Sequence, residues 1–134
     1  MKTIYVDTSV FGGKFDEEFG YWTQKFFDRV LNENIKLLKS DVADDELTGS
    51  PEFVREFVDS LPERIIQKIE LSEEAIWLAE QYITENVVGK ASKADCFHIA
   101  IATIQKVDLL VSWNFPNGMA MPQTHCKYRT DTWL

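Results

Sequence analysis

Short apolar runs alternate with longer helical patterns along most of this chain, and no other feature constrains its fold as strongly. Such alternation is typical of a parallel sheet, because neighbouring parallel strands need a crossover connection and that connection is usually a helix. We therefore expect an α/β fold with a central parallel sheet covered by helices. The expected strands are residues 3–6, 35–40, 65–71 and 108–112.

The expected helices are marked by apolar residues that recur every three or four positions. The first stripe runs through Phe15, Phe19, Trp22, Phe26 and Val30 and predicts a helix over residues 17–32. Stripes with this period usually pack in a core, so we interpret these aromatic side chains as core and not as a stacking surface for a cofactor. Residues 7–9 form the expected turn after the first strand, and further helices are expected from 42, from 51 to about 61, from 73 and over 93–105.

The composition is that of one globular domain spanning residues 1–134. With 45% hydrophobic residues and no repeat or linker, a chain of 134 residues can bury about two thirds of its unfolded surface. No apolar stretch approaches the length needed to span a bilayer, so we expect no membrane-spanning segment. Cys96 and Cys126 lie in contrasting contexts that disfavour a disulfide, and we therefore expect a cytoplasmic protein. The net charge of -8 disfavours tight nonspecific binding to nucleic acid, because phosphate contacts come from lysine and arginine.

Three acidic residues stand far apart in the sequence, each at the end of, or just past, a segment that should be buried. Asp7 closes the first strand, Glu46 follows the second, and Asp95 opens the apolar run of the last helix. A buried carboxylate without a partner costs several kcal/mol, so acids in such places normally converge on a cation or on hydrogen-bond donors. The carboxyl ends of parallel strands line one edge of a sheet, where these acids can meet. Such a cluster suits magnesium or manganese.

Each of these acids also has a plainer interpretation. Asp95 alone could be a first-turn acid favoured by the helix dipole. Glu46 follows Asp44 and Asp45, and a run of acids is usually a solvated face. His98 lies one turn after Asp95 and could be a ligand or a general base, but a structural histidine on a packed helix is the favoured interpretation.

Four short segments, in this order, carry a family resemblance. They are Val-Asp-Thr-Ser at 6–9, Ala-Asp-Asp-Glu-Leu at 43–47, Ala-Asp-Cys-Phe-His-Ile-Ala-Ile-Ala at 94–102 and Leu-Val-Ser-Trp-Asn-Phe at 110–115. Together they resemble a PIN domain, in particular the branch that includes toxins of bacterial toxin–antitoxin pairs. The third segment, followed closely by Ser-Trp-Asn, is the most specific part of the resemblance.

The resemblance implies a three-layer α/β/α sandwich and a ribonuclease that uses Mg²⁺ or Mn²⁺. It implies that Asp7, Glu46 and Asp95 are the metal ligands, and that Asn114 stands where the family has a fourth acid or this polar residue. The implied substrate is single-stranded RNA. The implied partners are a cognate antitoxin protein and a second copy of the chain in a homodimer.

The chemistry of phosphodiester hydrolysis explains these residue types. A divalent ion held by carboxylates offsets charge on the phosphoryl oxygens and lowers the pKa of a water molecule. We assign Asp7 and Asp95 to direct coordination, Glu46 to further coordination or to orienting water, and Asn114 to hydrogen bonding with phosphate or water. Thr8 and Ser9 are candidates for a phosphate contact or for a turn or helix cap.

The last part of the chain departs from the family pattern. Residues 116–134 show neither helical nor strand periodicity, so we expect an atypical tail and a missing edge strand. Together with the acidic balance, this leaves open a catalytically impaired PIN-like domain that binds a protein partner. A third interpretation is another α/β fold that uses aspartate. A haloacid-dehalogenase-like phosphatase is disfavoured because Ser9 stands where its second aspartate is expected. A receiver domain is disfavoured because its acidic pair, central aspartate and late lysine do not line up with this sequence.

Overall fold

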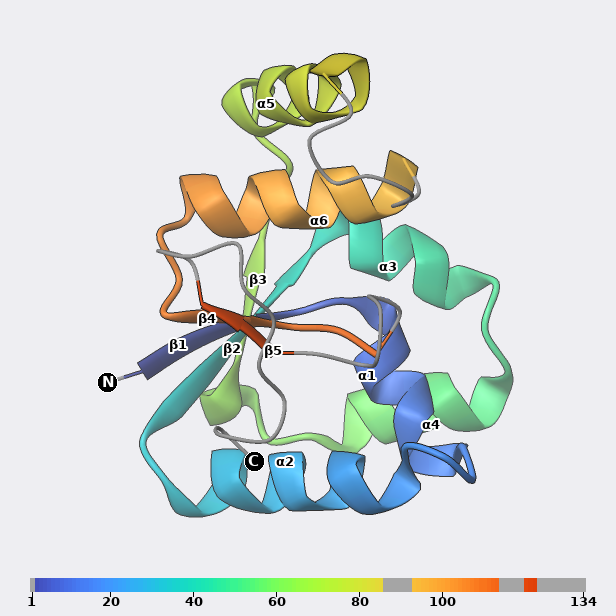
Figure 1. Cartoon of the computed structure of the whole chain (residues 1–134). Coiled ribbons are helices and arrows are strands. Elements are labelled where there is room, and N and C mark those ends of the chain that lie inside the picture. The colour runs from blue at the N-terminus through green and yellow to red at the C-terminus, as the bar shows by residue number, and fades with distance from the viewer. Residues whose placement is uncertain (1, 86–92, 114–119, 123–134) are drawn as a thin grey trace.

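The computed structural model describes residues 2–85, 93–113 and 120–122 and contains a five-stranded sheet with the order β3-β2-β1-β4-β5 (Figure 1). The strands are β1 (Lys2–Val6), β2 (Ile35–Ser40), β3 (Ile66–Ile69), β4 (Leu109–Val111) and β5 (Ala120–Pro122). The first four pair in parallel, as the alternation of strands and helices predicts. β5 pairs antiparallel with β4.

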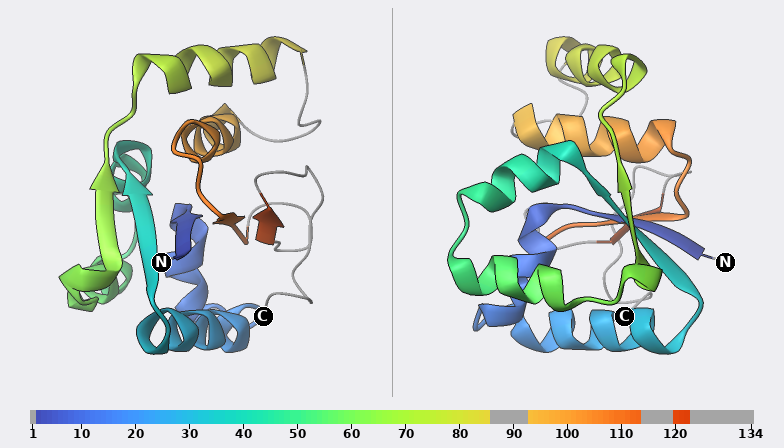
Figure 2. Two further views of the ribbon diagram at one scale, coloured as in Figure 1. Left: turned by 90° about the vertical axis from the view of Figure 1, so that its left-hand side faces the viewer. Right: turned by 180° about the vertical axis from the view of Figure 1, so that it is seen from behind.

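Helices connect the strands and cover both faces of the sheet. In chain order they are α1 (Thr8–Gly12), the 3₁₀ turn η1 (Gly13–Phe15), α2 (Gly20–Asn32), α3 (Asp41–Thr48), α4 (Glu52–Ser60), the 3₁₀ turn η2 (Glu63–Ile65), α5 (Glu73–Glu85) and α6 (Lys93–Ile104). Figure 1 shows α1, α2 and α4 on one side of the sheet and α6 on the other, and Figure 2 shows α5 on the outer side of α6. The expected α/β sandwich is confirmed.

The core has two halves because side chains alternate across each strand. Ile4, Val6 and Leu37 face the half packed by α2 and α4, whereas Tyr5 and Leu38 face the half packed by α5 and α6. Strands buried on both faces are typical of parallel sheets whose faces are both covered by helices. The predicted aromatic stripe of α2 is only partly core: Phe26 is fully buried, but Trp22 is exposed.

Three expectations about local structure were wrong. The helix expected from residue 17 begins at Gly20, because the Asp16 carboxylate accepts the backbone N–H groups of Glu18 and Phe19 and holds a turn there. Thr8 and Ser9, expected in a turn, form the first turn of α1, which Asp7 caps by accepting the N–H of Ser9.

The third correction concerns the edge strand. Within residues 116–134, Ala120–Pro122 forms β5 and covers the free edge of β4, so the edge strand expected to be missing is present. Its Pro122 lacks a backbone N–H, which is tolerated at a sheet edge. No helix in the described ranges is long and apolar enough to cross a lipid bilayer.

Candidate functional site

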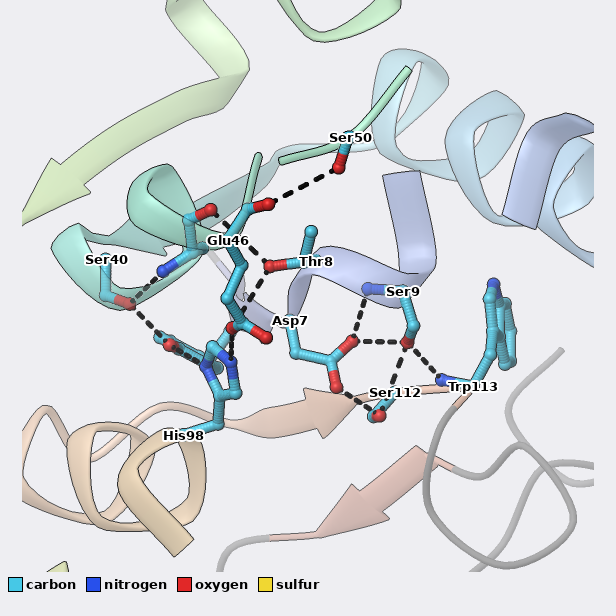
Figure 3. Close-up of polar contacts among 11 residues, drawn as sticks. Asp7, Thr8, Ser9, Ser40, Glu46, Ser50, His98, Ser112 and Trp113 are labelled. Atoms are coloured by element: carbon cyan, nitrogen blue, oxygen red, sulfur yellow. Dashed lines mark hydrogen bonds and ion pairs between the residues drawn. The ribbon is translucent and has the colours of Figure 1, made fainter. Parts of the chain in front are cut away.

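Three of the four predicted site residues lie around the carboxyl-terminal ends of the central strands. Asp7 follows β1, Glu46 lies in α3 directly after β2, and Asp95 is in the first turn of α6. Because β1 lies between β2 and β4, the segments that leave these strands are neighbours in space. Figure 3 shows Asp7 and Glu46 at this end of the sheet, with His98 beside Glu46 and Ser112 beside Asp7.

Asp7 is a carboxylate withdrawn from water, with 1% of its surface exposed. Its Oδ1 accepts the backbone N–H of Ser9 at 3.0 Å, and the hydroxyls of Ser9 and Ser112 donate to Oδ1 and Oδ2. Burial raises the pKa of Asp7 above its ordinary value and repulsion by Asp95 adds to the rise, while His98 and the two serine hydroxyls oppose it. Asp7 is therefore influenced by two charged groups of α6 and by the hydroxyls of Ser9 and Ser112.

Glu46 is more exposed than Asp7, since 37% of its side chain is accessible. Its Oε1 lies 2.6 Å from His98 Nε2 and accepts the hydroxyl of Thr8 at 3.3 Å. The hydrogen bond with His98 is the main reason why the pKa of Glu46 is lowered, although partial burial opposes it. Glu46 is therefore ionised at neutral pH and held from two sides.

His98 is buried in α6, and both of its ring nitrogens contact side chains. Nδ1 lies 2.5 Å from the Tyr5 hydroxyl, which in turn lies 2.7 Å from Ser40 Oγ. The sequence favoured a structural histidine, and its position one turn after Asp95 was the only signal of a place near the acids. The contact with Glu46 joins residues 52 positions apart, which local periodicity does not reveal.

Trp113 belongs to the core, as expected, and is 6% exposed. Its ring stacks on Phe19 with centroids 5.5 Å apart, and its Nε1–H donates to Thr23 Oγ1 at 3.0 Å. Its backbone N–H donates to Ser9 Oγ at 2.9 Å, so the same hydroxyl that donates to Asp7 also fixes the chain after β4. These contacts give Ser9 a local structural role.

The carboxylate oxygens of the predicted ligands are the donors that a hard divalent ion prefers, and the charge of Asp95 contributes to the raised pKa of Asp7. In this side-chain arrangement, however, Asp7 and Glu46 are held by protein donors. Within the described residues, no three His, Cys, Asp or Glu side chains are grouped closely enough to hold a metal ion. Asn114, the fourth predicted site residue, lies outside the described residues.

No family model and no curated protein matches this sequence. Solved structures do match the fold. VapC20 of Mycobacterium tuberculosis, a toxin that cleaves the sarcin–ricin loop, aligns with a TM-score of 0.65 and 10% identity over 84% of this chain and 92% of its own.

Two further structures match over similar lengths. VapBC2 from Rickettsia felis, bound to a DNA fragment from its promoter, aligns with a TM-score of 0.62 and 16% identity over 86% of this chain and 94% of its own. FitAcB from Neisseria gonorrhoeae aligns with a TM-score of 0.61 and 14% identity over 83% of this chain and 87% of its own. The chain therefore has the fold of PIN-domain toxins, as the resemblance implied. At these identities the likeness defines the fold alone.

Proposed function

We propose that this chain is a divalent-metal-dependent ribonuclease that hydrolyses phosphodiester bonds of single-stranded RNA, and that it is the toxin of a toxin–antitoxin pair. One observation carries the proposal. The carboxylate of Asp7 lies at the end of β1, where burial raises its pKa and two groups of α6, His98 and Asp95, act on it with opposite signs. Buried acids with a perturbed pKa are concentrated at functional sites.

In the proposed site, Asp7 and Asp95 are direct ligands of Mg²⁺ or Mn²⁺. Glu46 is a further ligand or orients water, and Asn114 donates a hydrogen bond to phosphate or water. When bound, the ion offsets the charge of the phosphodiester and lowers the pKa of a water molecule. The protein's own contribution is to hold the acids in place: Thr8 donates to Glu46, and Ser9 donates to Asp7.

The proposed partners follow from charge and from the shared fold. The protein has a net charge of -8 and carboxylates at its site. A cationic segment of an antitoxin would bind there, because charge-assisted pairs with carboxylates are strong. We place the protein in the cytoplasm, where its RNA substrate is, and propose that it forms a homodimer. VapC20, which shares the fold, is a toxin that cleaves the sarcin–ricin loop.

The proposal is tested by incubating the purified protein with a labelled single-stranded RNA. We expect cleavage with Mn²⁺ or Mg²⁺ and none after chelation. The variant Asp7→Asn should lose most of the activity, whereas Asp59→Asn, which removes an exposed acid of α4, should retain it. Cleavage that survives both chelation and Asp7→Asn would refute the proposal.

A second candidate function is a catalytically impaired PIN-like domain that acts as a protein-binding module. The arrangement of the acids favours it, because no metal-holding group of three is formed within the described residues. Under this alternative the protein binds an antitoxin-like partner, but neither Mn²⁺ binding nor RNA cleavage is measurable. The same cleavage assay therefore separates the two candidates.

A further inference from the structure

A series of hydrogen bonds runs from the buried interior of the fold to the partly exposed Glu46. It starts at Ser40 at the end of β2, continues through the Tyr5 hydroxyl on β1 to His98 on α6, and ends at Glu46 on α3. Figure 3 shows Ser40, His98 and Glu46 near one another. The contacts of this series are 2.7, 2.5 and 2.6 Å long, all within good hydrogen-bond range. Four side chains from four different elements are thereby fixed relative to one another.

The direction of the hydrogen bonds follows from the groups at each end. Burial strongly raises the pKa of Tyr5, so its hydroxyl keeps its proton. If Tyr5 donates to Nδ1, the proton of a neutral His98 ring is on Nε2 and points at Glu46. If the ring carries both protons, Tyr5 donates instead to Ser40 Oγ, and Nε2–H still points at Glu46.

The remaining tautomer is unfavourable. A neutral ring with its proton on Nδ1 would place the Nε2 lone pair 2.6 Å from an oxygen of the ionised Glu46 carboxylate. Two acceptors at that distance repel each other. The contact from His98 Nε2 to Glu46 is therefore a donated hydrogen bond in both favourable states of the ring.

Core packing alone does not require this series of hydrogen bonds. Tyr5 and His98 are essentially fully buried, and apolar side chains of similar size would fill the same space without the cost of desolvating polar groups. Glu46, by contrast, is accessible enough to be solvated by water without help from His98. The hydrogen bonds of Tyr5 and His98 instead fix the orientation of one partly exposed carboxylate, that of Glu46.

We propose that His98 is a positioning residue of the site, which, supported by Tyr5, holds Glu46 in one orientation at the end of the sheet where Asp7 and Asp95 lie. This inference rests on the proposed function, because it assigns His98 to the carboxylate that would bind the ion or orient water. Partners of this kind behind metal ligands typically contribute about 10- to 100-fold to metal affinity.

The test compares two amide variants of His98 that differ in where they place an N–H donor. The amide nitrogen of Gln in His98→Gln reaches the position of Nε2 and keeps the donor to Glu46, whereas that of Asn in His98→Asn reaches only the position of Nδ1. We expect Mn²⁺ affinity, measured by calorimetry on the folded proteins, to fall about tenfold in His98→Asn and to be largely retained in His98→Gln. Tyr5→Phe should weaken binding, and should add little to His98→Asn because the two act in series.

A spectroscopic measurement on the metal-free protein keeps the inference testable if a His98 variant does not fold. Nitrogen NMR of the wild type should show a slowly exchanging proton on His98 Nε2, and Tyr5→Phe should broaden it. A proton on Nδ1 alone, or equal Mn²⁺ affinity in wild type, His98→Gln and His98→Asn, would overturn the role of His98. If the wild type itself binds no Mn²⁺ and cleaves no RNA, the failure lies with the proposed function.

Discussion

At the scale of single residues, Asp7 is a site residue whose buried charge lowers the stability of the fold. Its carboxylate is almost completely buried, its two oxygens accept hydrogen bonds, and its pKa is raised, chiefly by burial, with repulsion by Asp95 adding to the effect. An Asn side chain at this position has the same shape and can still cap α1. It is therefore the negative charge of Asp7, and not its shape, that destabilises the folded protein.

We predict that Asp7→Asn stabilises the metal-free protein by about 1 kcal/mol at neutral pH, because functional residues are often not optimal for stability. The gain should depend on pH. Below the unfolded-state pKa of Asp, about 4, the charge is absent in both states and the effect is small. As pH rises through the raised pKa of folded Asp7, the wild type loses stability that the variant keeps.

Urea unfolding of both proteins between acid and neutral pH measures this difference. Asp59→Asn, in which an exposed acid is replaced, serves as the control and should show no such trend. A difference between wild type and Asp7→Asn that does not change with pH would contradict the account of Asp7.

At the scale of elements, the junction of α1 and η1 depends on a close approach to the chain after β4. A Cβ atom on Gly13 would lie 2.5 Å from Trp113 Cδ1 and 2.7 Å from Thr23 Oγ1. Gly12, its neighbour, has open space around the same position and a helical φ of -68°. The two glycines therefore form a matched pair.

We predict that Gly13→Ala destabilises the protein by about 1–3 kcal/mol, because Trp113 must move from its contacts with Phe19 and Thr23. Gly12→Ala should be neutral or stabilising by up to about 1 kcal/mol, because alanine has the higher helix propensity. Denaturant unfolding checks both values. Equal effects of the two substitutions would show that the packing of Trp113 against η1 is not important for stability.

Elements with strong local signals could be predicted from the sequence, and elements that depend on distant partners could not. β2 has the predicted bounds, because its apolar residues lie between clear turn signals. β5 has three residues and a proline, so only its pairing with β4 defines it. The same holds for the site: Asp7, Glu46 and Asp95 stood out as acids beside buried segments, but the contact between His98 and Glu46 forms only when α6 packs near α3.

At the scale of the whole molecule, β5 covers the edge of the sheet that β4 would otherwise leave open. Without β5, the backbone groups of β4 on that side would lack strand partners, and uncovered edges promote self-association. We predict that deleting residues 116–134 lowers the melting temperature and increases association, whereas deleting residues 123–134, which keeps β5, has a smaller effect. Thermal unfolding with light scattering measures both. Equal loss in the two truncations would indicate that β5 contributes little.

The proposed toxin should also be controlled by its partner as a whole molecule. We predict that co-expression with a protein encoded beside it yields a complex that does not cleave RNA, because a cationic segment of the partner neutralises the carboxylates at the site. Substitution of the arginines or lysines of that segment by alanine should restore cleavage. A complex that cleaves RNA as fast as the free protein would contradict this mode of control.

The central claim is that Asp7, Glu46 and Asp95 together bind a divalent ion, and the thermal shift caused by Mn²⁺ tests it most directly. An ion that binds only the folded state stabilises it by about 2.7 kcal/mol at 100 times its dissociation constant, and so should raise the melting temperature by several degrees. We predict this shift for the wild type and for Asp59→Asn, and its near-complete loss in a folded Asp95→Asn variant. An equal shift in all three proteins, or none in the wild type, would contradict the claim.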